Sequence, residues 1–218
     1  MLQRVLPRLY PILDAGLLLR DGLSIEGFAH ALRAAGIRFL QYRDKEAPDE
    51  VLLERAAMLR RIFPSSDSCL ILNDRVSLLL SSGYDGLHVG QEDLPPATAR
   101  ALVGPEVLLG VSTHGERQLL SAENGPADYV AIGPVFATSS KAVPDPVVGL
   151  EGVRVARALT TKPLVAIGGI GRANCAAVLA AGADSVAVIS DLIPRPGNSV
   201  GEVVKEFFSQ LGDHSQIS

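Results

Sequence analysis

The fold is decided by the stretch from residue 37 to residue 73, which reads IRFLQYRDKEAPDEVLLERAAMLRRIFPSSDSCLILN. It begins with a short β-rich run, Ile37–Tyr42, and continues with an amphipathic segment that Pro48 opens and Phe63 ends. A second apolar run follows at Leu70–Asn73. Runs that are apolar on both faces are typical of buried parallel strands, and the segment between them has the pattern of a crossover helix.

The same alternation continues in both directions and gives eight strand-and-helix units. Ser24 is placed to cap a helix over Ile25–Ala35, and Gly36 suits the turn that follows it. The even spacing, with no GxGxxG after the first strand, favours a closed barrel over a doubly wound open sheet. We expect one (β/α)8 TIM-barrel domain over residues 1–218, with the barrel at about 8–212 and a short polar tail. The strands are expected at Leu9–Leu13, Ile37–Tyr42, Leu70–Asn73, Gly86–Val89, Leu108–Ser112, Tyr129–Ile132, Leu164–Ile167 and Val186–Ile189.

Composition narrows the classes of function. The formal net charge of −4 argues against a globally basic surface for nucleic acid or anionic lipid. No apolar run is long enough for a membrane span, and the N-terminus lacks a signal-peptide pattern. Cys69 and Cys175 lie in apolar contexts without a metal-binding spacing. These features predict a cytoplasmic protein without nucleic-acid or membrane partners, and they leave small-molecule partners and a homo-oligomer open.

A barrel enzyme of this kind carries its active site at the carboxyl ends of the strands. After the second strand, alternation points Gln41, Arg43 and Lys45 toward one side, although such a charge run is also typical of a solvated surface. The third strand and the loop after the fourth supply Asp74 and Asp93, whose carboxylates suit Mg²⁺. The alternative, less favoured role of each aspartate is to cap the helix that follows it.

Hydroxyls, a lysine and glycines follow the later strands. Ser112 ends the fifth strand, and Thr138-Ser139-Ser140-Lys141 follows the sixth. Gly168-Gly169 after the seventh strand and Ile189-Ser190 after the eighth are typical of a backbone phosphate site. His88 lies inside a strand and is expected to be a hydrogen-bonded core residue. His114 suits a loop, a cap or a proton shuttle, and we assign catalysis to neither histidine.

Five motifs in this order resemble those of the thiamine phosphate synthase family over nearly the whole chain. They are Gln41-x-Arg43-x-Lys45, Leu72-Asn73-Asp74-Arg75, GLHVGQEDLP at residues 86–95, GVSTH at residues 110–114 and GPVF at residues 133–136. The resemblance implies the joining of a hydroxymethylpyrimidine diphosphate to a thiazole phosphate, with release of diphosphate.

The resemblance also implies roles for individual residues. Gln41, Arg43, Lys45 and Asn73 would contact the pyrimidine diphosphate, and Asp74 and Asp93 would bind Mg²⁺. Ser112 would lie near the leaving group, and Lys141 would hold diphosphate. Arg43, Lys45, Ser112 and Lys141 are therefore the expected catalytic residues. The thiazole phosphate would be bound by Thr138, Ser139, Ser140, Gly169, Ile189 and Ser190.

The chain departs from the family pattern after the sixth strand, where Pro-Thr-x-Thr-Lys is replaced by Ala137-Thr138-Ser139-Ser140-Lys141. The change affects loop stiffness and puts the thiazole affinity in question. Three other functions compete with the synthase. The first is a thiazole tautomerase of similar fold, which carries a histidine where this chain has Pro134. The second is a non-catalytic metabolite-binding barrel, which would lack charged residues at the strand ends. The third is a sugar-phosphate isomerase, which would need a catalytic base at the mouth.

Overall fold

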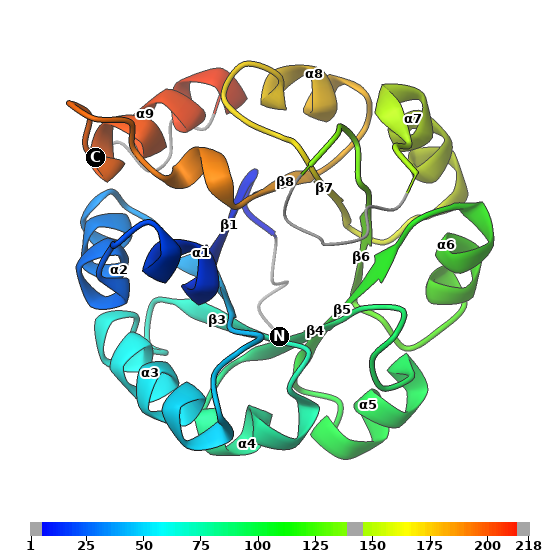
Figure 1. Cartoon of the computed structure of the whole chain (residues 1–218). Coiled ribbons are helices and arrows are strands. Elements are labelled where there is room, and N and C mark those ends of the chain that lie inside the picture. Colours follow the sequence, from blue (N-terminus) through cyan, green and yellow to red (C-terminus); the bar gives the residue numbers. More distant parts are fainter. Residues whose placement is uncertain (1–5, 139–145, 213–218) are drawn as a thin grey trace.

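A computed structural model describes residues 6–138 and 146–212 of the chain. Eight parallel strands form a closed barrel in sequence order, with the first strand paired to the eighth. Figure 1 shows these strands as a central ring within an outer ring of helices. The strands are β1 (Leu9–Asp14), β2 (Phe39–Arg43), β3 (Cys69–Asn73), β4 (Gly86–Val89), β5 (Leu108–Thr113), β6 (Tyr129–Ile132), β7 (Leu164–Ile167) and β8 (Ser185–Val188).

Helices connect the strands on the outside of the barrel. Two short 3-10 helices, η1 (Val76–Leu78) and η2 (Ser190–Leu192), lie in the connections that follow β3 and β8. Within the described residues, no helix is long and apolar enough to cross a membrane. The α-helices are α1 (Ala15–Arg20), α2 (Ile25–Ala34), α3 (Asp49–Ile62), α4 (Leu79–Ser82), α5 (Pro96–Val103), α6 (Glu116–Glu123), α7 (Gly149–Leu159), α8 (Cys175–Ala180) and α9 (Val200–Leu211).

The closed barrel and all eight strands confirm the sequence prediction, with strand ends that differ by at most two residues. Helix signals were also informative. The Ser24 side chain accepts a hydrogen bond from the Gly27 amide, and Gly36 adopts a positive φ of 95° after α2. Glycine accepts that backbone conformation at low cost, so the helix ends where the sequence indicated.

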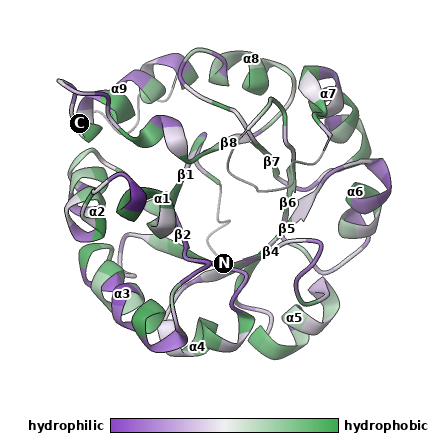
Figure 2. Ribbon diagram, in the orientation of Figure 1, coloured by the Kyte–Doolittle hydropathy of each residue, from purple (hydrophilic) through white to green (hydrophobic). Residues whose placement is uncertain are grey.

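Alternation along each strand separates two hydrophobic clusters. Leu9 and Leu13 of β1 belong to the larger cluster, which lies between the strands and the helices. Tyr10 and Ile12 of the same strand belong to the smaller cluster inside the barrel. Figure 2 shows hydrophobic and hydrophilic residues on most of the outer helices, as expected for helices with one buried face.

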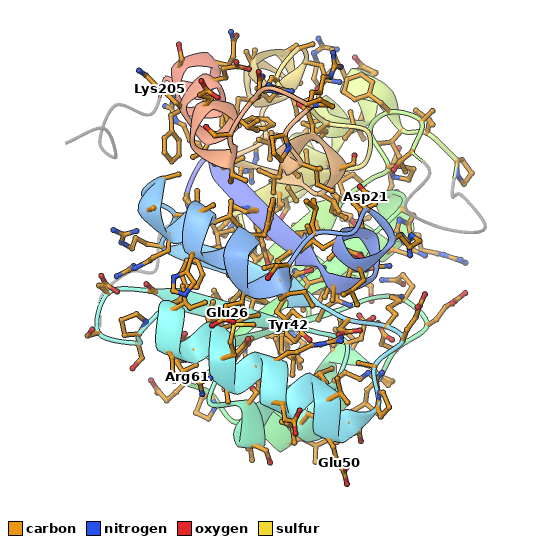
Figure 3. The ribbon with its side chains drawn as sticks, turned by 60° about the vertical axis from the view of Figure 1, so that its left-hand side comes forward. Asp21, Glu26, Tyr42, Glu50, Arg61 and Lys205 are labelled. Carbon is orange, nitrogen blue, oxygen red and sulfur yellow. The ribbon has the colours of Figure 1, made fainter. Side chains whose placement is uncertain are left out.

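The side-chain view gives an example of this layering. Tyr42 of β2 is completely buried and lies between the strands and the outer helices, whereas Glu26, Glu50, Arg61 and Lys205 are exposed on the helices (Figure 3). The Tyr42 hydroxyl donates to the Asp44 carboxylate at 2.9 Å, and Arg55 of α3 also donates to that carboxylate. These bonds fix the start of the loop that carries Lys45.

Ion pairs of one type recur at the end of the barrel opposite the strand carboxyl ends. In each pair, the aspartate lies just before one strand and accepts a hydrogen bond from a helix arginine. The same carboxylate accepts from one backbone amide near the start of the neighbouring strand that precedes it in the sequence. We call these three groups the basal braces. They are Arg60–Asp85 with the amide of Leu70, Arg100–Asp128 with the amide of Leu109, and Arg157–Asp184 with the amide of Leu164.

The braces should contribute to stability because removal of the aspartate leaves a strand amide without its acceptor and a half-buried guanidinium without its counter-charge. We expect Asp85→Ala to lower the free energy of unfolding by about 2 kcal/mol. Glu151→Ala, which removes the exposed pair with Arg154, should change it by less than about 0.5 kcal/mol. Urea unfolding of both variants measures the difference, and equal losses would contradict a structural role for the braces.

Candidate active site

A cavity of about 750 Å³ opens at the carboxyl ends of the strands. It is lined by every predicted site residue within the described part of the chain: Gln41, Arg43, Lys45, Asn73, Asp74, Asp93, Ser112, Thr138, Gly169, Ile189 and Ser190. Ser139, Ser140 and Lys141 lie outside the described residues. Segments far apart in the sequence therefore meet at one mouth.

The two aspartates form a pair of carboxylates. Burial, followed by the neighbouring Asp93, raises the pKa of Asp74 to about 6. The Lys45 ammonium lies 3.4 Å from the Asp74 carboxylate and works in the opposite direction. Two like charges in such a place are stabilised by a cation between them. The pair therefore has the electrostatic character of a cation site.

Neither aspartate caps a helix, which removes the alternative role suggested by the sequence. The 3-10 helix η1 and the helix α5 begin without a side-chain cap. Asp93 instead accepts from the Gly90 amide at 2.7 Å, within its own loop. Asp74 has a φ of 64°, the only positive value of a non-glycine residue in the described chain. A positive φ is unfavourable for a residue that has a side chain. No cap hydrogen bond from the Asp74 side chain to η1 offsets that cost.

The donor set fits a hard divalent ion such as Mg²⁺. Within residues 6–138 and 146–212, no group of three or more histidine, cysteine, aspartate or glutamate side chains could hold a metal ion. Mg²⁺ commonly binds to one or two carboxylates and completes its octahedral shell with water and substrate phosphates. Asp74 and Asp93 supply that number of carboxylates, next to cations suited to a polyphosphate.

Arg43 is held in place by an aspartate that the sequence did not single out. Its guanidinium forms an ion pair with Asp14, which is buried at the end of β1. The other oxygen of Asp14 accepts from the Leu17 amide at 2.8 Å and so caps α1. One carboxylate thus fixes both the first helix and the orientation of the arginine.

A chain of hydrogen bonds runs through the barrel below the mouth. The Gln41 amide donates to the Tyr10 hydroxyl at 2.8 Å, and the hydroxyls of Tyr10 and Tyr129 are 2.8 Å apart. Nδ1 of His88 lies 3.0 Å from the Tyr129 hydroxyl, and its Nε2 lies 2.8 Å from the Ser112 hydroxyl. We call these five residues the interior chain. They confirm that His88 is a hydrogen-bonded core residue.

Burial determines the charge of the interior chain. It lowers the pKa of His88 to about 4, so the imidazole is neutral at neutral pH. It also raises the pKa of the Tyr10 and Tyr129 phenols, which keep their protons. All five members are therefore uncharged and bonded to one another, as buried polar groups must be.

The opposite side of the mouth is built by tightly packed loops. Gly168 and Gly169 have φ values of 101° and 63°. The Phe136 amide donates to the Gly168 carbonyl at 2.9 Å, which ties the loop after β6 to the loop after β7. A Cβ atom on Gly169 would lie 2.5 Å from the Ala137 carbonyl oxygen. Only glycine fits there, and its backbone is open to the cavity.

A salt bridge joins the loops after β7 and β8. Arg172 donates to both oxygens of Asp191, and the Arg172 amide donates to the same carboxylate at 2.7 Å. Burial alone would raise the pKa of Asp191, but its bonds with Arg172 outweigh burial and lower it. The Asn174 side chain donates to the Gly169 carbonyl at 3.0 Å. These contacts hold Gly169 and Ser190 at one edge of the cavity.

The cavity is chemically asymmetric. Among the described lining residues, the acidic and basic side chains come from β2 and from the loops after β2, β3 and β4: Arg43, Lys45, Asp74, Glu92 and Asp93. Its floor on the other side is apolar and consists of Ala131, Val165, Ile167, Ala187 and Ile189. Such a surface suits an uncharged ring next to the glycine-rich edge. The sequence did not single out this floor, because Val and Ala in a barrel strand are usual packing residues.

Two further residues at the mouth have well-defined partners. Nδ1 of His114 lies 2.6 Å from the Gly133 carbonyl oxygen, so that nitrogen carries the hydrogen. The Gln91 side chain donates to the Ser112 carbonyl at 2.6 Å and fixes the loop after β4 to β5. Both residues line the cavity. Cys175 is a buried free thiol within the described chain, as expected of a packing residue.

Known structures resemble this chain to different degrees. A thiamine phosphate pyrophosphorylase from Pyrococcus furiosus superposes with a TM-score of 0.83 at 30% identity, covering 94% of this chain and 96% of the other. A phosphoribosyl anthranilate isomerase from Thermus thermophilus gives 0.65 at 16% identity, covering 94% and 98% of the two chains. The second likeness shows the barrel fold alone.

Sequence comparisons are more specific. Residues 9–192 match the family model described as thiamine monophosphate synthase. The thiamine-phosphate synthase of Koribacter versatilis is 49% identical over 92% of this chain and 95% of its own length. That of Chloroflexus aurantiacus is 43% identical over 85% of each. The chain therefore belongs to the thiamine monophosphate synthase family.

Proposed function

We propose that this protein joins a pyrimidinylmethyl diphosphate to a thiazole phosphate, forming thiamine phosphate and releasing diphosphate. Two observations support this proposal: the chemical asymmetry of the mouth and the names of the relatives. One half offers cations and paired carboxylates for a metal-bound diphosphate. The other half offers an apolar floor and an edge of glycine amides for a ring with a phosphate. Two phosphorylated heterocycles fit such a site better than a single substrate does.

The charged half would bind the pyrimidine diphosphate. Arg43 and Lys45, with Gln41 and Asn73, would contact this substrate, and Asp74 and Asp93 would hold Mg²⁺. When bound, the ion would neutralise charge that builds up on the diphosphate oxygens. Lys141, outside the described residues, is proposed as a further cation for the diphosphate.

The reaction needs stabilisation of a leaving anion more than it needs a strong base. The bond between the exocyclic carbon and the diphosphate oxygen breaks, and its electron pair leaves with the diphosphate. The aminopyrimidine ring donates electron density to that carbon, and the thiazole nitrogen then forms the new bond with its lone pair. Arg43 and Lys45 would meet the growing negative charge as preorganised cations, and Ser112, which lines the same cavity, would add a hydrogen bond.

The apolar half would position the thiazole phosphate. Backbone amides near Gly169 and Ser190 would bind its phosphate, together with the hydroxyls of Thr138 and of Ser139 and Ser140 in the loop that is not described. Ile189 and its apolar neighbours would pack against the ring. Holding the nitrogen close and in line is worth up to about 7–11 kcal/mol of the barrier in well-oriented reactions. We place the reaction in the cytoplasm, in keeping with the free thiol of Cys175.

The direct test is to mix the purified protein with both substrates and Mg²⁺ and to measure thiamine phosphate and diphosphate. We expect both products in equal amounts. Isomerisation of a thiazole phosphate without the pyrimidine substrate would instead support the tautomerase, and binding without turnover would support a non-catalytic barrel.

The paired carboxylates generate the prediction about metal use. We expect activity to require a divalent cation and to be lost in excess EDTA. Asp74→Asn and Asp93→Asn should each raise the Mg²⁺ concentration needed for half-maximal activity by about tenfold or more, because each removes a charged oxygen ligand. Circular dichroism melting would check folding. Full turnover in EDTA would show that the carboxylates serve another purpose.

The glycine edge generates a separate prediction. Gly169→Ala places a Cβ against the Ala137 carbonyl and forces an L-residue into a positive φ. We expect it to weaken thiazole phosphate binding about tenfold or more and pyrimidine diphosphate binding less than about twofold. Gly115→Ala is the control, since a Cβ there meets nothing within 4 Å. Calorimetric titration of each variant with each ligand measures these affinities. Equal losses of affinity for the two ligands in Gly169→Ala would mean that the thiazole phosphate binds elsewhere.

A further inference from the structure

The interior chain connects two residues that the proposed function assigns to substrate contact. Gln41 forms one end and Ser112 the other, and Tyr10, Tyr129 and His88 lie between them. These three are at most 7% exposed. They come from β1, β6 and β4, so the chain crosses the barrel from wall to wall. The orientation of the two end groups is therefore set by the same buried residues.

The Gln41 amide starts one direction of donation through the interior chain. Gln41 donates to Tyr10, so the Tyr10 hydroxyl can use its hydrogen for Tyr129. In this direction Tyr129 donates to Nδ1 of His88, which lies 3.0 Å from its hydroxyl. A neutral imidazole that accepts at Nδ1 carries its hydrogen at Nε2 and donates from there. Its partner is the Ser112 oxygen. The Ser112 hydrogen then points away from the imidazole, toward the cavity that this residue lines.

Close packing holds this geometry. A Cβ atom at Gly110 of β5 would lie 2.3 Å from the Tyr129 hydroxyl oxygen and 2.5 Å from Nδ1 of His88. The glycine thus allows both rings to lie against the strand backbone. The rings themselves are tilted by 35° with centroids 5.5 Å apart. Neither ring can turn without displacing its neighbours.

We propose that His88 is a positioning residue that holds the Ser112 hydroxyl as a hydrogen-bond donor toward the bound pyrimidine diphosphate. The proposal rests on the proposed function and adds a buried residue that acts through another side chain. Its consequence is that His88 acts on catalysis through Ser112 alone. Tyr129 and Tyr10 support it by fixing which imidazole nitrogen carries the hydrogen.

The first test needs no activity. Nitrogen-15 NMR of the full chain, labelled at its four histidines, reports which imidazole nitrogens are protonated. The His88→Gln variant assigns the signals. We expect His88 to be neutral, with the hydrogen on Nε2 and a bare Nδ1. A hydrogen on Nδ1 would mean that the hydrogen bonds of the interior chain run in the opposite direction, and it would overturn the proposal. A charged ring at neutral pH would overturn it as well.

The second test is a double-mutant cycle in the synthesis assay. His88→Phe keeps a ring but removes both hydrogen bonds, and we expect it to lower kcat about tenfold or more with little change in KM for the pyrimidine diphosphate. In the Ser112→Ala background the same change should lower kcat by less than about twofold. His88→Gln should restore most of the activity, since its amide nitrogen can take the place of Nε2. An equal loss in both backgrounds would mean that His88 acts independently of Ser112.

A second variant guards against misfolding of His88→Phe. Tyr129→Phe removes one hydroxyl of the interior chain and should lower kcat about three- to tenfold. Tyr84→Phe is the matched control, because Tyr84 is also buried but its hydroxyl contacts the Ala56 carbonyl outside the barrel. We expect its kcat to stay within about twofold of the wild type. Equal effects of the two changes would overturn the proposal, whereas a wild type that forms no thiamine phosphate would instead refute the proposed function.

Discussion

Closure of the parallel sheet is the constraint on which the whole site depends. Once β8 pairs with β1, every second side chain of each strand must enter the barrel, and the strand carboxyl ends must meet at one rim. Gln41 and Arg43 face inward for the same reason that Tyr42 faces the helices. Alternate residues of each strand therefore face the inside and the outside of the barrel, whether or not a ligand is bound. The inner volume is filled by side chains that pack against and hydrogen-bond to one another.

Charge at the rim follows from this arrangement. Asp74 and Asp93 are brought together by neighbouring strands, and the cost of their proximity is seen in the raised pKa of Asp74. Lys45 offsets part of that cost from the same side, whereas Arg43 is occupied by Asp14. Among the described residues, those that line the far side of the mouth carry no comparable charge and offer backbone amides and apolar contacts. A site divided in this way can hold two substrates in fixed relative positions.

The sequence predicted the barrel, the strand positions and the residues at the mouth because each depends on local pattern. Alternation placed Gln41 and Arg43, and glycine turns placed the helix ends. The sequence did not predict the interior chain. Tyr10 and Tyr129 are far apart in sequence, and only closure of the barrel brings their hydroxyls together. The Asp14 and Asp191 contacts were missed for the same reason. The capping alternative for Asp74 and Asp93 was settled by backbone geometry, which residue types alone do not determine.

The most direct measurement is a crystal structure of the protein with Mg²⁺, diphosphate and thiamine phosphate. Our account predicts one metal ion bound by the carboxylates of Asp74 and Asp93 and by diphosphate oxygens, with Arg43 and Lys45 on the same anion. The thiazole phosphate should lie against the amides near Gly169 and Ser190. A diphosphate bound at the glycine edge, or a metal that contacts neither aspartate, would contradict the division of the mouth into two half-sites.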